Sequence, residues 1–205
     1  MSVLVGKVAP FFHDASKMFA AVEGDGNIVE NFNFQKATVN QYAVVFFYPL
    51  DFTFVCPSEL IAFHNRLQAF QERNTVVISV SLDSHFTHAA WRNTPIEKGG
   101  VGPLGYIMVS DIKREIIQAY DVESSNGVAL RGSFLIDKVG VVQHQVVNNL
   151  PLGRNVDEML RMIDALQFSE KHGEVCPAGW KKGHDGMQPN AKGVATYLAK
   201  HAQSL

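Results

Sequence analysis

Five short, mostly apolar runs are the feature of this sequence that most restricts its fold. They are rich in valine, isoleucine and phenylalanine and cover residues 43–48, 75–81, 106–109, 131–136 and 141–147. Most of them are nearly continuously apolar, which is typical of strands whose two faces are both buried. Helical patterns separate several of them, so the sequence predicts an α/β protein. A chain of 205 residues is long enough for one large domain with its own core.

Apolar spacing and capping residues predict the helices. Between the first two strands, apolar side chains recur at steps of three and four residues and predict one helix over Pro57–Phe70 (Leu60, Phe63, Leu67 and Phe70). Three further helices follow from capping residues: Ser84 to Asn93, Asp111 to Tyr120, and Asn155 to Gly173. A hairpin turn at residues 138–140 adds an antiparallel pair. We therefore expect a mixed sheet flanked by helices.

The composition changes near the end of the chain. After Gly173 it shifts to glycine, lysine, proline and histidine, with one short amphipathic segment at Gly193–Lys200. We expect two parts, a domain over residues 1–168 and a C-terminal tail over residues 169–205.

Charge and apolar patterning exclude several classes of function. Lys and Arg number 18 against 20 Asp and Glu, so the net charge of −2 leaves no basic surplus for nucleic acid or an anionic membrane. Met1–Phe12 lacks the basic start and long apolar run of a signal peptide, and Tyr42–Leu50 is less than half a membrane span. We expect a soluble, cytoplasmic protein that binds neither nucleic acid nor a membrane.

Two weaker patterns do not predict a ligand site. His85 and His88 share one face of a predicted helix, but no third metal ligand lies near them, and we expect them to be surface polar residues. The segment Gly99–Gly102 lacks a following Lys-Ser/Thr and is not a phosphate-binding loop.

Cys56 is the first candidate for chemistry. It follows a buried strand and a seven-residue loop and directly precedes Pro57, a residue favoured at the first helical position. Backbone N–H groups and the helix dipole stabilise a thiolate there, the nucleophilic form of cysteine. Arg131, a cation within an apolar strand, and the hydroxyl of Thr53 are candidate partners of the sulfur. The spacing alone is equally consistent with a structural cysteine and an arginine at an exposed strand end.

Cys176 is the other cysteine of the chain, and two cysteines are too few for a secreted disulfide scaffold. The tripeptide Val-Cys-Pro occurs at residues 55–57 and again at 175–177, but the second copy lies in the polar tail beside Glu174. No helix dipole activates a thiol there. The setting suits a thiol that attacks an already oxidised sulfur, and it fits an incidental exposed cysteine equally well.

Four segments resemble motifs of the typical 2-Cys peroxiredoxins, the family that includes bacterial alkyl hydroperoxide reductase C and thioredoxin peroxidases. PLDFTFVCPSE at residues 49–59 is similar to the family's peroxidatic-cysteine loop, and LRGSF at 130–134 to its active-site arginine strand. NNLPLGR at 148–154 and GEVCPAGW at 173–180 resemble the later motifs. The match covers nearly the whole chain. It implies a thioredoxin-like fold with a mixed central sheet, flanking helices and a C-terminal extension.

The resemblance also implies a role for each site residue. Cys56 would be the peroxidatic cysteine and Cys176 the resolving cysteine. The resemblance implies three further groups of site residues. They are the active-site companions Pro49, Thr53 and Arg131, a supporting hydrogen-bond layer of Glu59 and Arg154, and Trp91 in the surrounding wall. Without the family, the last three fit an ordinary first-turn acid, a surface cation and a core residue equally well.

The implied activity is reduction of hydrogen peroxide and organic hydroperoxides, with no metal, flavin or haem. Cys56 would form a sulfenic acid and then a disulfide with Cys176 of the other subunit of a homodimer, in a ring of five dimers. Thioredoxin or a flavoprotein disulfide reductase would recycle the disulfide. Two other hypotheses remain open: a holdase chaperone, known for some relatives, and a thioredoxin-like binding module with inert thiols.

Two segments depart from the eukaryotic form of the family. In the segment Gly99–Gly102, Val101 replaces the leucine of the usual Gly-Gly-Leu-Gly loop. Near the C-terminus, Leu198 replaces the phenylalanine of the usual Tyr-Phe pair. We therefore expect a weaker C-terminal clamp, faster disulfide closure and more resistance to inactivation by excess peroxide.

Overall fold

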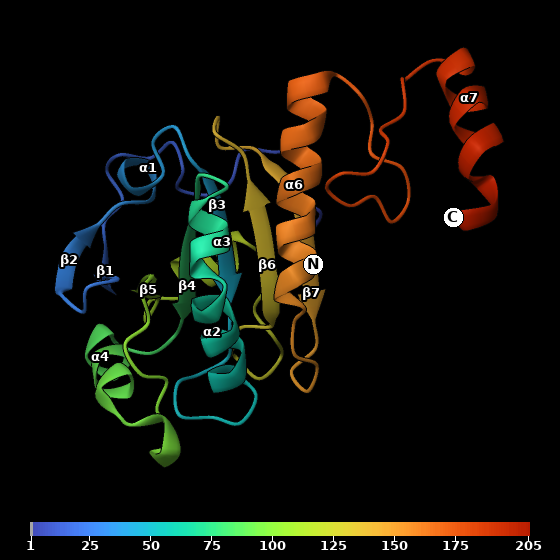
Figure 1. The fold of residues 1–205 in the computed structure, drawn as a ribbon. Helices are drawn as coiled ribbons and strands as arrows, with labels where there is room; N and C mark the ends of the chain where they lie inside the picture. The colour runs from blue at the N-terminus through green and yellow to red at the C-terminus, as the bar shows by residue number, and fades with distance from the viewer. Residues whose placement is uncertain (1) are drawn as a thin grey trace. The chain divides into compact units, whose positions relative to one another are not determined.

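Within residues 2–205, the part of the chain that the computed structural model describes, seven strands form one sheet (Figure 1). They are β1 (Phe19–Val22), β2 (Ile28–Phe32), β3 (Tyr42–Phe47), β4 (Thr75–Ser81), β5 (Ile107–Ser110), β6 (Arg131–Ile136) and β7 (Val142–Asn148). Their order is β2-β1-β5-β4-β3-β6-β7. β3, β4 and β5 pair in parallel, and the other neighbours pair antiparallel. The five predicted strands and the mixed sheet are confirmed.

The chain divides into two compact units, one that ends at Val156 and one over Asp157–Leu205. The sheet belongs to the first unit. The expected boundary between residues 1–168 and 169–205 concerns function, falls inside helix α6 (Val156–His172), and stays a prediction.

The central strand β3 is buried on both faces, since all six of its residues are buried. Successive side chains of a strand point to opposite faces. On one face Phe46 stacks on Phe63 of α2 (Cys56–Asn65), with ring centroids 4.0 Å apart. On the other face Phe47 packs against Tyr120, with centroids 5.0 Å apart. Because both faces are covered, this strand is a continuous apolar run in the sequence.

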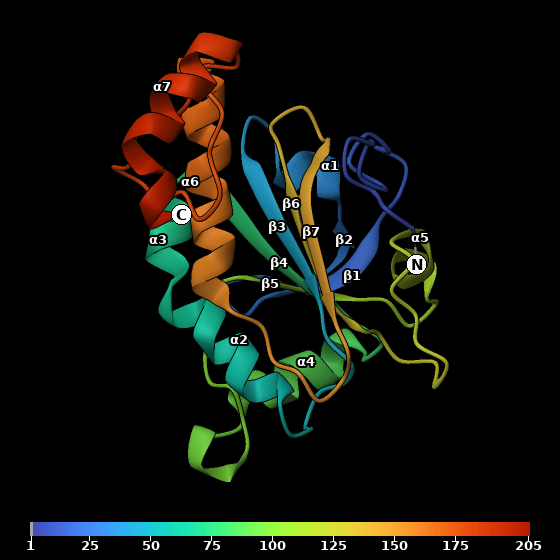
Figure 2. The ribbon, with the colours of Figure 1, turned by 90° about the vertical axis from the view of Figure 1, so that its right-hand side faces the viewer.

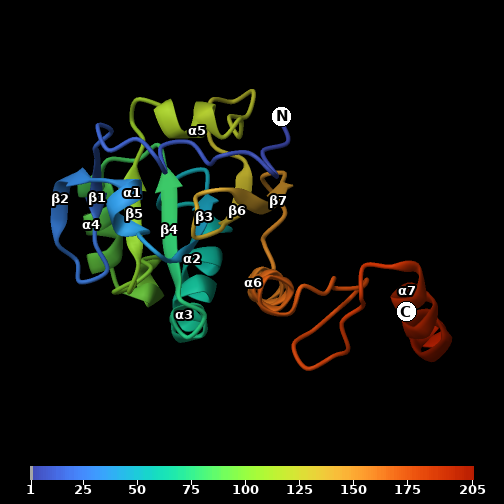
Figure 3. The same cartoon turned by 90° about the horizontal axis from the view of Figure 1, so that it is seen from above.

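Helices cover both faces of the sheet in the first unit. Figures 2 and 3 show α2 and α3 (Leu67–Gln71) on one side and α5 (Glu115–Ala119) on the other. The remaining helical segments of this unit are α1 (Phe34–Ala37), α4 (His85–Asn93) and a 3₁₀ turn at Ile96–Lys98. Across residues 2–205, none of the helices combines the length and the apolar character that crossing a membrane requires.

The single helix predicted over Pro57–Phe70 is wrong, because the structure has two helices there. α2 ends at Asn65 and α3 begins at Leu67. Between them Arg66 adopts φ −111° and ψ 9°, and its N–H bonds to the carbonyl of Phe63 in a tightened last turn. The apolar face nevertheless continues across the break, since Phe63 and Phe70 are both buried.

Capping residues begin two other helices. The hydroxyl of Ser84 accepts the N–H of Thr87 and starts α4 where the sequence predicts it. α5 begins later than predicted, at Glu115, because Arg114 before it has a φ of 63°. The carboxylate of Asp111 still caps α5, since it accepts the backbone N–H groups of the second and third helical residues at 3.1 and 2.7 Å.

Strand β1 and the edge strand β2 have no counterpart in the sequence-based expectations. β1 has four residues, and three of the five residues of β2 are exposed, so neither produces a long apolar run. The hairpin between β6 and β7 is confirmed. Gly140 adopts a φ of 81°, and the Asp137 carboxylate accepts the N–H groups of Val139 and Val141 at 2.9 Å each.

The second unit contains most of α6 and the helix α7 (Ala191–His201), followed by a 3₁₀ turn at Ala202–Ser204. Gly173 adopts a φ of 66° directly after α6, as its predicted role of helix terminator requires. α7 covers the predicted amphipathic segment Gly193–Lys200. The carboxylate of Asp185 forms two ion pairs with the end of α7, at 2.5 Å to Lys200 and 2.9 Å to His201.

The stacked pair of Phe46 and Phe63 provides a test of the core on the α2 side of the sheet. Phe63→Ala should lower the free energy of unfolding by about 3–5 kcal/mol, because it leaves a cavity against β3. Val39→Ala, at a residue with 59% of its surface exposed, is the control and should change it by less than about 0.5 kcal/mol. Urea unfolding followed by circular dichroism measures both. Equal effects of the two variants would contradict this description of the core.

Candidate active site

Cys56 is the first residue of α2, beyond the carboxyl end of the central strand β3. It is buried, with 1% of its surface exposed. Val55 holds the N-cap position, Pro57 lies in the first turn, and no side chain of residues 2–205 caps the helix there. The N–H groups of this turn and the helix dipole therefore favour negative charge beside the sulfur. The predicted placement of Cys56 at a helix start is confirmed.

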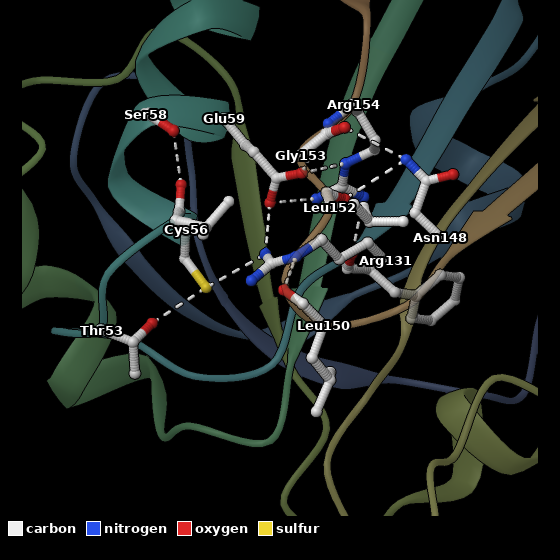
Figure 4. Close-up of polar contacts among 12 residues, drawn as sticks. Thr53, Cys56, Ser58, Glu59, Arg131, Asn148, Leu150, Leu152, Gly153 and Arg154 are labelled. Atoms are coloured by element: carbon white, nitrogen blue, oxygen red, sulfur yellow. Dashed lines mark hydrogen bonds and ion pairs between the residues drawn. The ribbon is translucent and has the colours of Figure 1, made fainter.

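The hydroxyl of Thr53 contacts the sulfur from the preceding loop (Figure 4). Its Oγ1 lies 2.9 Å from Cys56 Sγ and 2.8 Å from the carbonyl oxygen of Leu50. A hydroxyl has one hydrogen, so it cannot donate to both acceptors at once. With a thiol at Cys56, Thr53 can donate to Leu50 and accept from the S–H group. With a thiolate, it can turn its hydrogen to the sulfur.

Arg131 is the first residue of β6 and reaches Cys56 from this neighbouring strand. Its Nη1 lies 3.4 Å from Sγ and donates to Oε2 of Glu59, while its Nε donates to the carbonyl of Leu150 at 2.7 Å (Figure 4). Only 4% of its surface is exposed. The alternative of an arginine at an exposed strand end is therefore wrong, because this guanidinium is buried and paired.

Arg154 and Glu59 form the supporting layer behind Arg131. The Nε and Nη2 atoms of Arg154 each lie 3.0 Å from a different oxygen of the Glu59 carboxylate, which is a bidentate ion pair. Nη1 of Arg154 donates to the carbonyl oxygens of Phe47 and Gly132 at 2.6 and 2.9 Å. Burial lowers the pKa of the Arg154 guanidinium, and the Glu59 carboxylate opposes that shift. Arg154 is thus a buried cation, not a surface one.

In the cluster formed by Arg131, Arg154 and Glu59, positive charges outnumber negative ones. The two are equal in number only when the sulfur of Cys56 is ionised as well. Arg131 and Arg154 carry two positive charges, and Glu59 carries one negative charge between them. All three side chains have 4% or less of their surface exposed, so solvent does little to screen the remaining positive charge. A thiolate at Cys56 brings the sum to zero. The cluster therefore favours an anion at the position of Sγ.

Pro49 and Trp91 hold the loop that precedes Cys56. Pro49 is buried two residues after the end of β3, where its ring fixes the backbone φ. Trp91 is fully buried, and its Nε1 donates to the carbonyl of Gly99 at 2.8 Å. Its ring lies 5.6 Å from that of Phe52 and 6.2 Å from that of Tyr48, between centroids. Trp91 thus supports the loop and not the sulfur itself.

The prediction that His85 and His88 are surface residues is wrong. His85 is 8% exposed and His88 is fully buried, where its Nδ1 lies 2.8 Å from the carboxylate of Asp51. A buried imidazole is tolerated because this carboxylate satisfies one ring nitrogen. Trp91 follows His88 by three residues and marks the buried face of α4, a signal that could have placed the histidine inside.

The carbonyl acceptors of the site were also missed. Leu50 accepts from Thr53, and Leu150 accepts from Arg131. Backbone oxygens carry no residue-type signature, so only their position within the segments 49–59 and 148–154 could have indicated them.

Cys176 lies in the second unit as a half-buried free thiol. Its Sγ lies 3.4 Å from the carbonyl oxygen of Ala165 in α6. Burial raises the pKa of the Cys176 thiol, and the positive charge of Arg161 opposes this shift. At neutral pH Cys176 is therefore mainly a thiol, in contrast to the anion that the surroundings of Cys56 favour.

Comparison with known proteins places the chain in one family. Residues 5–145 match the model of the AhpC/TSA family, and residues 165–200 match that of the C-terminal domain of 1-Cys peroxiredoxin. The chain is similar to alkyl hydroperoxide reductase C of Helicobacter pylori, with 51% identity over 99% of this chain and 100% of the relative. It is also similar to peroxiredoxin-2 of Macaca fascicularis, with 46% identity over 96% of each chain.

Solved structures agree with this assignment. Reduced 2-Cys peroxiredoxin of Plasmodium vivax superposes with a TM-score of 0.91 and 47% identity, over 97% of this chain and all of that one. Alkyl hydroperoxide reductase C of Enterococcus faecalis gives a TM-score of 0.71 and 33% identity, over 78% of this chain and 93% of that one. The predicted thioredoxin-like fold is therefore confirmed. With this sheet, this cysteine site and relatives matched over their full length, the chain belongs to the AhpC/TSA family and is a peroxiredoxin.

Proposed function

We propose that this chain is a thiol-dependent peroxidase in which the thiolate of Cys56 reduces hydrogen peroxide and organic hydroperoxides. The observation that carries the proposal is the position of Sγ, 2.9 Å from the hydroxyl of Thr53 and 3.4 Å from the guanidinium of Arg131 at a helix start. These groups stabilise negative charge on the sulfur and on an oxygen beside it. Relatives named alkyl hydroperoxide reductase C and peroxiredoxin-2 support the same reaction.

In the first step, the Cys56 thiolate attacks the terminal oxygen of the hydroperoxide and the O–O bond breaks. The sulfur gains the OH group and becomes a sulfenic acid. The bonding electrons leave with the other oxygen, which takes a proton and departs as alcohol or water. Arg131 and Thr53 stabilise the charge as it moves along the O–O bond. Glu59 and Arg154 hold Arg131 in place, and Pro49 and Trp91 hold the loop.

In the second step, the thiol of Cys176 attacks the sulfenic acid, a disulfide forms and water leaves. We propose that this Cys176 belongs to the other subunit of a homodimer and that five dimers form a ring. A disulfide needs Cα atoms within about 7 Å, and Cys56 is buried with 1% of its surface exposed, so we propose that the first turn of α2 opens to release its sulfur. The lack of a side-chain cap on α2 within residues 2–205 supports this opening.

A dithiol protein then reduces the disulfide by exchange. Thioredoxin and a flavoprotein disulfide reductase are the two candidate donors, and turnover reconstituted with each in turn distinguishes them. Two free cysteines and a dithiol donor favour a reducing compartment, and we propose the cytoplasm. In this scheme residues 1–168 reduce the peroxide, and residues 169–205 supply the resolving thiol.

Replacing Arg131 tests the proposed charge stabilisation. Arg131→Met should keep the fold and slow peroxide reduction by about 10²–10³-fold, the scale for loss of one such donor. The control Arg114→Met removes a half-exposed arginine of a surface ion pair and should leave the rate unchanged. Stopped-flow kinetics with hydrogen peroxide measures the rates of both variants, and Cys56→Ser serves as the inactive reference. Peroxide reduction that survives Cys56→Ser would overturn the proposed function.

The same variant tests the chaperone hypothesis. If Cys56→Ser still protects other proteins from aggregation, the chaperone role is separate from the peroxidase activity.

Replacing Cys176 tests the resolving step. Cys176→Ser should retain the first turnover and lose recycling by a dithiol protein, because resolution follows attack on the peroxide. On non-reducing gels the oxidised wild type should migrate as a dimer and the variant as a monomer. An oxidised wild-type monomer would contradict a disulfide between subunits.

The pH dependence of alkylation tests the protonation state of Cys176. In a Cys56→Ser background, burial should keep the midpoint of its reactivity above the ordinary thiol value of 9.0. Arg161→Met should move the midpoint higher still, because the guanidinium charge lowers this pKa. Rates of iodoacetamide labelling across pH 7–11 give both midpoints. A midpoint below the ordinary value, or one unmoved by Arg161→Met, would contradict this description of the thiol.

A further inference from the structure

A buried polar cluster lies under the Cys56 loop and takes no part in the proposed chemistry. Its centre is the carboxylate of Asp51, within the loop of residues 49–55. Oδ1 accepts the hydroxyl of Tyr48 at 2.7 Å, and Oδ2 lies 2.8 Å from Nδ1 of His88. The side chains of Asp51 and His88 have no exposed surface, and Tyr48 is fully buried. A fully buried carboxylate in a loop is costly unless such partners satisfy it.

The backbone of Asp51 is tied to the same region. Its N–H donates to Oδ2 of Asp83 at 2.9 Å, and that oxygen also accepts the hydroxyl of Ser81 at 2.8 Å. Ser81 is the last residue of β4, and Asp83 precedes α4. The hydroxyl of Ser110, at the end of β5, donates to the carbonyl of Asp83 at 2.7 Å. Asp51 is thus bonded directly to α4 through His88, and indirectly to the ends of β4 and β5 through Asp83.

The hydrogen positions in this cluster follow from its chemistry. Burial, and then the charge of Asp51, raise the pKa of Tyr48 well above its ordinary value, so the hydroxyl stays protonated and donates. An ionised carboxylate only accepts, so Nδ1 of His88 carries the hydrogen of the second bond. Nε2 of His88 is buried and has no hydrogen-bond partner in the described chain. The bond from His88 to the carboxylate of Asp51 is therefore made by Nδ1–H, and the same nitrogen also lies 3.4 Å from the hydroxyl of Tyr48.

Asp51 is connected to the sulfur through the residues that follow it. Phe52 adopts a φ of 53°, in the left-handed region, and its ring packs on Trp91. The next residue is Thr53, whose hydroxyl lies 2.9 Å from Cys56 Sγ. A strained residue between the anchor and Thr53 persists only while its surroundings hold it. The bonds at Asp51 therefore act on the position of the Thr53 hydroxyl.

From these contacts we infer that His88 and Tyr48 are positioning residues, which anchor Asp51 and so hold the Cys56 loop in the conformation that attacks peroxide. The inference rests on the proposed function. The anchored loop presents Thr53 and Cys56 together, whereas disulfide formation needs the loop open. Weakening the anchor should therefore affect the two steps in opposite directions.

The experiment compares two amide replacements of one histidine in the reduced full-length protein. His88→Asn places an amide nitrogen where Nδ1 lies and keeps the bond to Asp51. The side chain of His88→Gln is one methylene longer than that of His88→Asn, so its amide lies near the position of Nε2 and the bond to Asp51 is lost. Tyr48→Phe removes the other side-chain donor to Asp51, together with the contacts of this hydroxyl with His88 and Ser81, and serves as a second variant should the glutamine disturb packing. The readouts are amide hydrogen exchange and the rates of the two chemical steps.

We expect exchange at residues 51–58 to rise on the order of tenfold in His88→Gln and Tyr48→Phe, the scale for loss of one hydrogen bond to a buried charge. Exchange in β3 and β4 should stay unchanged, and His88→Asn should match the wild type. Disulfide closure with Cys176 should accelerate by a similar factor, because it scales with the open population. The rate of peroxide attack should fall, by less, because the closed loop remains the major state.

Unchanged exchange at residues 51–58 in both His88→Gln and Tyr48→Phe would overturn the inference. So would a rise spread evenly over the strands, or a change of both rates in the same direction, since these indicate a general loss of stability. The exchange measurement needs no peroxide. It therefore stands apart from the Cys56→Ser test, whose failure would overturn the proposed peroxidase function alone.

Discussion

The pairing of one carboxylate with two arginines is the interaction on which the rest of this site depends. Glu59 comes from α2, Arg131 from β6, and Arg154 from the segment before α6, and each is buried. Buried charges are stable only when they are paired, so these three segments must meet for any of them to fold in place. Their sum leaves one positive charge beside Cys56. The same ion pairs that join the segments therefore create the setting for an anionic sulfur.

The position of Cys56 places two opposing demands on its loop. In the proposed reaction, attack on peroxide needs the sulfur held against Thr53 and Arg131, whereas a disulfide with Cys176 needs it released. The start of α2 is weakly held, because no side chain of residues 2–205 caps it. The loop before it is strongly held at Asp51, by two buried side chains and a backbone bond. Under our proposal, the balance between these two ends sets how readily the loop opens.

The errors of the sequence-based predictions have physical causes. Strands β1 and β2 are short, and β2 is an edge strand with three exposed residues, so neither has the long apolar run that marks β3. The helix break at Arg66 is a local change of φ and ψ within an unbroken apolar stripe. His88 was placed at the surface because histidine is a polar residue, but a carboxylate from a distant loop satisfies it inside. Of these errors, the one at His88 concerns a partner that is remote in the sequence, because Asp51 lies 37 positions away.

The sequence by itself determined the strands buried on both faces, the capping residues and the start of a helix at Cys56. These follow from local composition and spacing, because burial on both faces and helix capping act on neighbouring residues. The tertiary structure decided that Arg131 and Arg154 are buried cations that share Glu59, and that His88 bonds to Asp51. Such pairs join residues tens of positions apart, and whether a charged side chain is paired or solvated depends on what the fold brings beside it.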